Sequence, residues 1–241
     1  GGRVVREPGH DHYADMVQEM RDLTELFTFE RGATLSSLLT TDVSVTSSPD
    51  LARLYGVKPW SGDGEPPRLP AETRGGLLQR AALLVSNLEQ TNPFHRGAFL
   101  RRHILCDDLP QPDPNALPPG ALDPPPVSDA ATTRERFQGK VDGNPLCQGC
   151  HGTFSDIGYV LEAFDALGRF RTVERVFDEK TGELLAELPI DATGVVRITE
   201  EDDEVVSGPL ALNERLVESG KVQACLADHY FRFASRRSAD A

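Results

Sequence analysis

The chain has 241 residues, which is enough for one large or two modest domains with a buried core. Apolar residues make up 39% of it and charged residues 26%, as in ordinary globular proteins, and no apolar run reaches the roughly 18 residues that span a bilayer. The formal net charge of −13 argues against nucleic acid as a partner, because binding phosphates needs a basic surface, and it suits a basic protein partner instead.

The first ten residues, GGRVVREPGH, resemble neither a signal peptide nor a natural start. We therefore expect either that a leader has been removed or that the chain is the remainder of a longer polypeptide or complex.

Helical signals dominate the first half of the chain. Helices are expected over 13–27, 48–56, 76–87 and 92–106. The first of these segments has apolar residues at helical spacing, the second has Ser48 before Pro49 and Gly56 as a stop, and the last begins with Asn92 and Pro93. Trp60, in the loop after the second helix, is expected to serve packing.

Residues 109–126 carry eight of the chain's 18 prolines, which predicts an extended connector, either a loose linker or a strap on the surface. A short capped helix is expected from 131 to 140 and a β-hairpin over 170–190, with its turn at DEKTG. The acidic stretch 200–204 is expected to form a solvated turn, with a weak calcium site as the alternative. Two further helices are expected over 209–219 and 221–237.

Cys147, Cys150 and His151 form a Cys-x-x-Cys-His motif, the attachment signature of c-type haem. The two thiols would add to the vinyl groups of the porphyrin, and the histidine would become the proximal iron ligand. A structural zinc site would need a second pair of ligands, which this sequence lacks, and a thioredoxin-like redox pair would follow a strand and need no histidine. On the spacing alone, zinc and a disulfide stay open as alternatives.

A second pattern follows the motif: Gly158-Tyr159, Leu161-Glu162 and Phe164-Asp165-x-x-Gly168-Arg169. With the motif, it resembles the signature of the planctomycete-type cytochrome c family, large exported bacterial proteins whose C-terminal regions are domains of unknown function. The resemblance runs from about residue 15 to residue 237, and it departs from the family at Ser155-Asp156 and at 235–237. It implies one covalent haem c per chain and a location in the periplasm or outside the cell.

The expected fold is mainly α with a small β-hairpin element, a c-type haem-binding helical domain with a proline-rich connector. The stretches are a helical segment that ends an upstream domain (1–72), a second helical segment (73–108), the connector (109–130) and the haem-binding region with hairpin and C-terminal helices (131–241). Export would favour a structural disulfide between Cys106 and Cys225, although two buried free thiols are the alternative.

Side chains outside the motif are candidates to complete the haem site. Arg169 and Arg171 could bind the propionates, or they are solvated arginines at a strand end. No methionine follows residue 20, so we predict His95 as the distal iron ligand, presented with Arg96 on the turn at Asn92. The other candidates are expected to fill the core, lie in a terminal loop or surround the disulfide: Met16, Met20, His10, His12, His103 and His229.

These residues favour an electron-transfer domain with a redox partner protein, because one haem appears without an acid–base pair, a nucleophile motif or a phosphate loop. Two alternatives stand beside it. One is part of a haem enzyme with an open iron face for oxygen or peroxide, and the other is a structural module that binds no haem.

Overall fold

The computed structural model describes residues 12–86, 90–109, 117, 119–178 and 180–236. In this part the fold is mainly α with small antiparallel β elements, as the sequence predicts. The helices are α1 (His12–Glu25), α2 (Leu35–Thr40), α3 (Pro49–Tyr55), α4 (Ala81–Leu84), α5 (Pro93–Phe99), α6 (Thr133–Val141), α7 (Pro145–His151), α8 (Ser155–Val160), α9 (Pro209–Glu218) and α10 (Lys221–Ser235). The strands are β1 (Val173–Phe177), β2 (Leu184–Pro189), β3 (Thr193–Val195) and β4 (Val205–Ser207). No described helix is both long and apolar enough to span a membrane.

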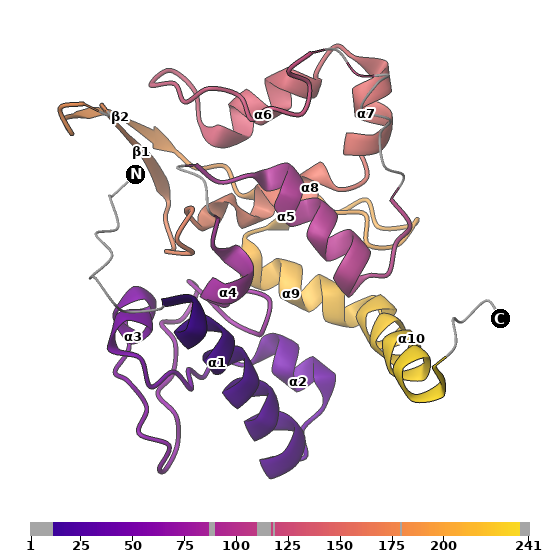
Figure 1. Ribbon diagram of the computed structural model, residues 1–241. Coiled ribbons are helices and arrows are strands. Elements are labelled where there is room, and N and C mark those ends of the chain that lie inside the picture. Colours follow the sequence, from indigo (N-terminus) through magenta and orange to yellow (C-terminus); the bar gives the residue numbers. More distant parts are fainter. Residues whose placement is uncertain (1–11, 87–89, 110–116, 118, 179, 237–241) are drawn as a thin grey trace.

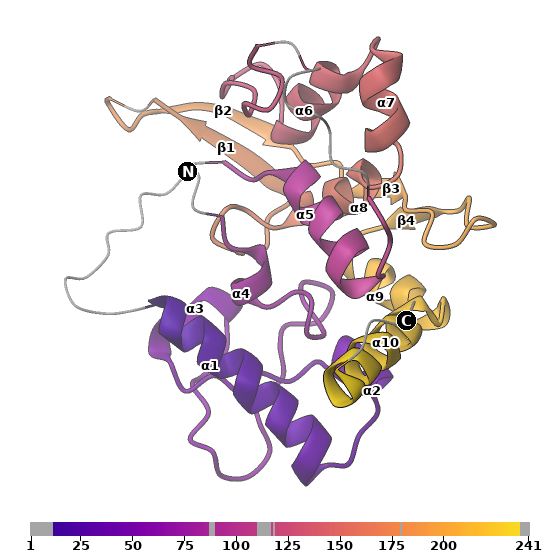
Figure 2. The same cartoon turned by 45° about the vertical axis from the view of Figure 1, so that its right-hand side comes forward.

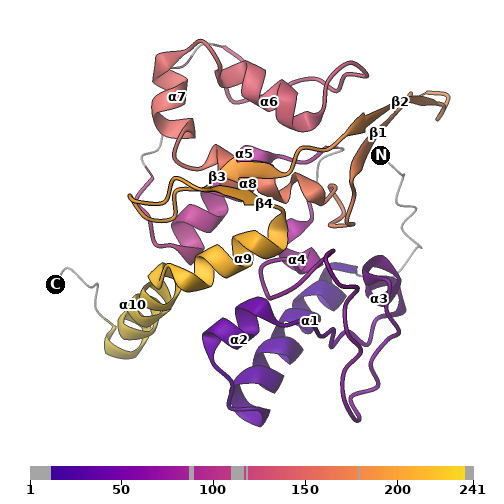
Figure 3. The same ribbon diagram turned by 180° about the vertical axis from the view of Figure 1, so that it is seen from behind.

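The elements lie in tiers (Figures 1 and 3). Helices α6 and α7 form one end, α5 and α8 cross in the middle beside the β3–β4 pair, and α1, α2 and α3 form the other end (Figure 2). The largest apolar core joins the middle tier to α9, α2 and the segment before α4. Its buried residues are Leu39, Leu78, Leu84, Leu100, Leu105, Ile157, Val160, Leu161, Phe164, Val196, Ile198, Val206, Leu212, Leu216 and Val222. The division of the chain into four stretches stays a prediction.

Most helix signals in the first half are confirmed. Helix α1 buries Met16 and Leu23, and Gly56 ends α3 with a positive φ of 73°. Ser48, however, does not cap α3 with its side chain, because its hydroxyl donates to Asp15 of α1 at 2.5 Å. The cap signal therefore located the helix start correctly but not the bond that the serine makes.

The predicted helix over 76–87 is wrong for most of its described length, because only α4 forms there. Gly76 has a φ of 67°, and a Cβ at this position would lie 1.9 Å from the carbonyl oxygen of Leu39. The side chains that follow then bond to main chain: Gln79 accepts from Gly75 N at 2.8 Å, and Arg80 Nε donates to Gly76 O at 2.9 Å. Arg80 is fully buried and also pairs with Glu19 of α1 at 3.4 Å, so tertiary contacts override the helical preference.

The helix predicted over 92–106 is confirmed as α5 followed by a π-helical turn over Leu100–Ile104. The Asn92 side chain caps α5 by accepting from His95 N at 3.0 Å. Helix α6 is confirmed too, with a capping box in which Thr132 and Glu135 satisfy each other's backbone N–H groups. Part of the proline-rich connector, residues 110–116 and 118, lies outside the described residues.

The described part of the connector is held to its surroundings. Gln90 Nε2 donates to Pro125 O at 2.7 Å, and Lys140 Nζ of α6 donates to Gly120 O at 3.0 Å and to Asp123 O. These bonds agree with a strap against the surface over 119–126.

The predicted hairpin is confirmed: β1 and β2 pair antiparallel, with Val173 opposite Pro189 and a bulge after Val176. The sequence did not reveal the second pair, β3 and β4. Between these two strands, Asp202 turns inward, where it accepts from Ile198 N at 3.2 Å and pairs with Arg215 at 3.5 Å. Among the described residues, no group of three acidic side chains converges at 200–204 as a calcium site would require.

Candidate functional site

Helix α7 carries the haem-type motif on one side. Its N-terminus is capped by Asn144, whose side chain accepts from Leu146 N at 3.1 Å, and Pro145 occupies the first turn. Cys147, Cys150 and His151 stand at i, i+3 and i+4, so all three lie on the same helix face. Both thiols are free, Cys147 half-buried and Cys150 exposed. Two unbonded thiols beside an imidazole are the side chains that a c-type haem requires, the thiols for covalent attachment and the imidazole for the iron.

Helix α7 buries none of its seven residues and packs mainly against α6. Figure 1 shows it at the edge of the molecule, beyond the tier of α5 and α8. A helix this short is not stable by itself in water, because most helix stability in proteins comes from tertiary packing. The site therefore lies on an element with a free surface at which a further group could pack.

The imidazole of His151 packs against the protein beneath α7. Its Nδ1 lies 3.3 Å from Ser155 Oγ, which leaves Nε2 as the nitrogen that could bind a metal ion. Its ring centroid is 4.0 Å from that of Phe94 and 4.8 Å from that of Phe154. Partial burial lowers the pKa of His151 below 6.5, and the nearby charge of Lys140 lowers it further. The imidazole is thus favoured in its neutral form, the form that ligates metals.

An aromatic cluster lies behind α7, with Phe94 at its centre. The Phe94 ring meets Phe137 of α6 edge-on at 4.9 Å and lies 6.3 Å from both Phe154 and Tyr159. Arg134 stands over the Tyr159 ring at 4.9 Å. Such flat apolar side chains suit a porphyrin. Sequence reasoning missed this cluster, and only Tyr159, in the family pattern, carried a signal.

The first turn of α5 is the element that faces His151, through Phe94. His95, the next residue, has an exposed side chain, and its backbone N–H is bonded to Asn92. Nothing in the structure tests whether His95 ligates iron, so this stays a prediction. The idea that Arg96 accompanies it outward is wrong: its guanidinium is buried and donates to the carbonyl oxygens of Leu161 and Phe164 at 2.9 and 2.8 Å.

The two arginines proposed for the propionates have carboxylate partners within the chain. Arg171 donates to Glu162 at 2.9 Å, and Arg169 pairs with Asp165 at 2.6 Å on a half-exposed surface. Glu162 is fully buried; burial raises its pKa, against the charges of Arg96 and Arg171. The binding of haem propionates by Arg169 and Arg171 stays a prediction. In the structure, these two arginines hold the segment after α8 through their carboxylate partners.

The other candidate ligands lie away from α7. Met16 is buried with Leu51 and Tyr55, as expected for core filling. His12 was expected in a terminal loop, but it is the first residue of α1 and lies 3.7 Å from Asp50. His10 lies outside the described residues. Cys106 and Cys225 are joined by a disulfide that links the end of the π-helical turn to α10 across 119 residues.

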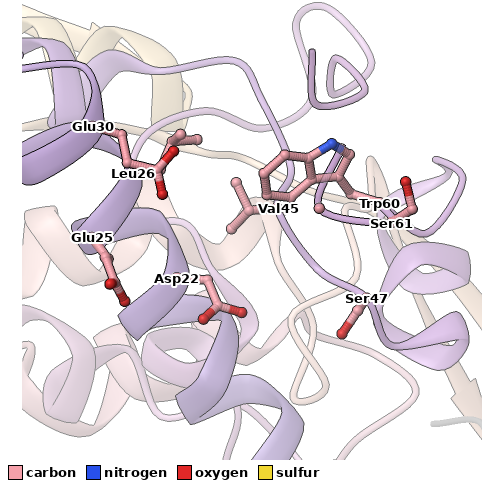
Figure 4. A pocket seen from close by; sticks show the side chains of 9 residues that line it. Asp22, Glu25, Leu26, Glu30, Val45, Ser47, Trp60 and Ser61 are labelled. Atoms are coloured by element: carbon pink, nitrogen blue, oxygen red, sulfur yellow. The ribbon is translucent and has the colours of Figure 1, made fainter. Parts of the chain in front are cut away.

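A separate hollow of about 270 Å³ opens on α1, far along the chain from α7. Figure 4 shows Asp22, Glu25 and Glu30 on one side of it, and Val45 and Trp60 on the other. Trp60 packs against the core around Leu23 and Phe27, in agreement with its expected packing role.

Residues 74–174 match the model of a family described as "PSCyt3: Protein of unknown function (DUF1588)". This part of the chain is similar to PSCyt3. The name marks a family related to planctomycete cytochromes c, and the match includes α7, His95 and both arginines but not Cys225. No curated protein and no solved structure matches the chain.

Proposed function

We propose that this chain is a c-type cytochrome domain that carries one haem c, attached through Cys147 and Cys150, with His151 as proximal ligand. The observation that carries the proposal is the face of α7, where two free thiols and an imidazole stand together on a helix that buries nothing. The similarity of residues 74–174 to PSCyt3 supports it. The domain then acts in electron transfer, in the periplasm or outside the cell.

When bound, the haem supplies a one-electron couple. The chain's own residues have three tasks around it. Ser155 orients His151 through Nδ1, so that Nε2 points away from the hydrogen bond. Phe94 and Phe154 exclude water from one side of the imidazole. The net charge of −13 draws a basic partner protein toward the domain, and this attraction weakens with salt.

Covalent attachment is tested by producing the chain in a host that matures c-type cytochromes and extracting the product with acid and acetone. The colour should remain on the protein, and a tryptic peptide with Cys147 and Cys150 should carry the mass of haem. The double variant Cys147→Ser, Cys150→Ser should lose it, whereas Leu146→Ser, a matched substitution at an exposed position of the same helix, should keep it. A colourless parent chain from a competent host contradicts the proposal.

The distal ligand decides between electron transfer and catalysis. With His95 as ligand, the ferric haem is low-spin and the reduced haem is inert to carbon monoxide; His95→Ala should then give a high-spin spectrum and carbon monoxide binding. His103→Ala is the control, because the His103 ring packs on Phe99 at 5.0 Å instead. If the parent itself is high-spin and binds carbon monoxide, His95 is not the ligand and the open iron face of a haem enzyme is the better reading.

A further inference from the structure

A second group of potential ligands lies far from α7, at the disulfide. Cys106, Cys225 and His229 place their Sγ and imidazole nitrogen atoms within 4.8 Å of one another. Within the described residues this is the one group of three or more histidine, cysteine or acidic side chains with ligand atoms so close. The closest approach beyond the disulfide is 3.5 Å, between Cys106 Sγ and His229 Nε2.

The spacing of the ligands explains this convergence. Cys225 and His229 stand at i and i+4 on α10, so they share one helix face. Cys106 comes from the other side, next to Leu105, the residue that caps the π-helical turn, and its φ of 54° takes the chain out of the helix. His103, three residues before Cys106, lies beside the group but contributes only its carbonyl oxygen, 3.8 Å from Cys225 Sγ.

The surroundings leave the group accessible and free of competing carboxylates. Cys106 and His229 are exposed, whereas Cys225 is buried. The carboxylates that neighbour the group in sequence are engaged elsewhere: Asp107 by Arg101 at 2.9 Å and by Lys221 at 2.5 Å, and Asp228 by Arg232 at 2.8 Å. A reductant can therefore reach the exposed sulfur, and the donor set after reduction is two sulfurs and one nitrogen.

We propose that Cys106, Cys225 and His229 form a zinc site that becomes available when their disulfide is reduced. An external dithiol gives two electrons and two protons to the S–S bond and becomes a disulfide itself, which leaves two thiols. Zn²⁺ then displaces both thiol protons, His229 binds through Nε2, and water completes a tetrahedron. The metal would hold α10 against the π-helical turn in place of the covalent bond. This inference goes beyond the haem proposal and does not depend on it.

The test uses the full chain with Cys147→Ser and Cys150→Ser, so that the only thiols come from the disulfide. The protein is reduced with a water-soluble phosphine, which does not bind zinc as a dithiol does, and is then mixed with zinc chloride and desalted. Metal analysis should give about one zinc ion per reduced chain and none on the oxidised chain. Zinc should also protect Cys106 and Cys225 from alkylation, read by mass spectrometry.

Single substitutions in this background separate a built site from loose thiol binding. His229→Ala should weaken zinc binding by about tenfold or more, because losing even a residue that only hydrogen-bonds to a metal ligand commonly costs that much affinity. His103→Ala should leave it unchanged. The proposal is overturned if reduced and oxidised chains bind equal zinc, or if His229→Ala binds like its parent. A reduced chain that unfolds and does not regain its helical signal with zinc also overturns it, because binding to a built site favours the fold. None of these results bears on haem attachment, because the test protein lacks Cys147 and Cys150 and no substitution in the series changes His151.

Discussion

Gly158 is the position at which the frame of the site can be tested most sharply. It lies where α8 crosses α5, and a Cβ there would stand 1.8 Å from Pro93 O, whereas ordinary contacts begin at 3.4 Å. For Gly158→Ala the helices must separate by about 1.6 Å, the difference between these two distances. The bonds from Arg96 to Leu161 O and Phe164 O, now 2.9 and 2.8 Å, would then exceed hydrogen-bonding distance.

The expected loss has two parts. Overpacking costs about 1–3 kcal/mol, and weakening of two hydrogen bonds from a charged donor costs about 1.5–3 kcal/mol each when complete. Because the chain will relax partly, we expect the free energy of unfolding to fall by about 3–5 kcal/mol in urea titrations followed by circular dichroism. Gly139→Ala is the control: nothing lies within 4 Å of its added Cβ, so α6 should gain up to about 1 kcal/mol. A Gly158→Ala protein within about 0.5 kcal/mol of the parent refutes the reasoning.

Three further predictions concern Arg96, the disulfide and the turn of the hairpin. Arg96→Lys should lower the free energy of unfolding by about 2–4 kcal/mol in urea titrations, because an ammonium group cannot replace the planar guanidinium that donates to four carbonyl oxygens. The control Arg175→Lys, at an exposed ion pair, should change it by less than about 0.5 kcal/mol. Equal effects of the two substitutions would contradict this prediction. Cys225→Ser should cost about 5 kcal/mol without reductant, since the bond to Cys106 closes a loop of 119 residues, and freely alkylated thiols in the parent would rule the bond out. Backbone N–H groups in the hairpin turn lower the pKa of Asp178 below its ordinary value of 3.8. The ionised carboxylate therefore stabilises the fold above pH 3.8, and this stabilisation is lost as the pH falls through the lower pKa of the folded state. An NMR titration of Asp178 with its midpoint at or above pH 3.8 would disprove the prediction.

Local signals allowed the sequence to predict those elements whose ends are fixed by neighbouring residues. The capped helix that begins near residue 131, the Asn92 cap and the hairpin all depend on residues within a few positions, and they appear as expected. The segment over 76–87 fails because Arg80 bonds to Glu19, 61 residues away, and such a contact leaves no periodic trace. The three-residue strands β3 and β4 are also too short to show alternation.

In the candidate site, too, the sequence predicted the local features but not the contacts between distant residues. The motif on α7 is local, so the sequence could place both thiols and the imidazole on one helix face. The partners of His151 are not local, because Phe94 comes from 57 positions earlier, and an aromatic residue there is as compatible with an ordinary core. The inward turn of Arg96 was hidden for the same reason, since its acceptors at Leu161 and Phe164 follow only after α8.

The sequence pattern that resembles the family has two parts, the Cys-x-x-Cys-His motif and the residues that follow it. Gly158 permits the crossing of α5 and α8, Glu162 engages Arg171 inside the protein, and Gly168 adopts a φ of 77° beside Ala81. Within the described residues, Glu162 bonds to Thr91, Arg96 and Arg171 and has no hydrogen bond or ion pair with Cys147 or Cys150, so the pattern beyond the motif specifies the platform and not the thiols and imidazole. Helix α7, by contrast, has little core of its own. Because two thioether bonds and the apolar face of a porphyrin would give α7 the packing it lacks, haem attachment should stabilise α7 and the orientation of His151 far more than the platform beneath them.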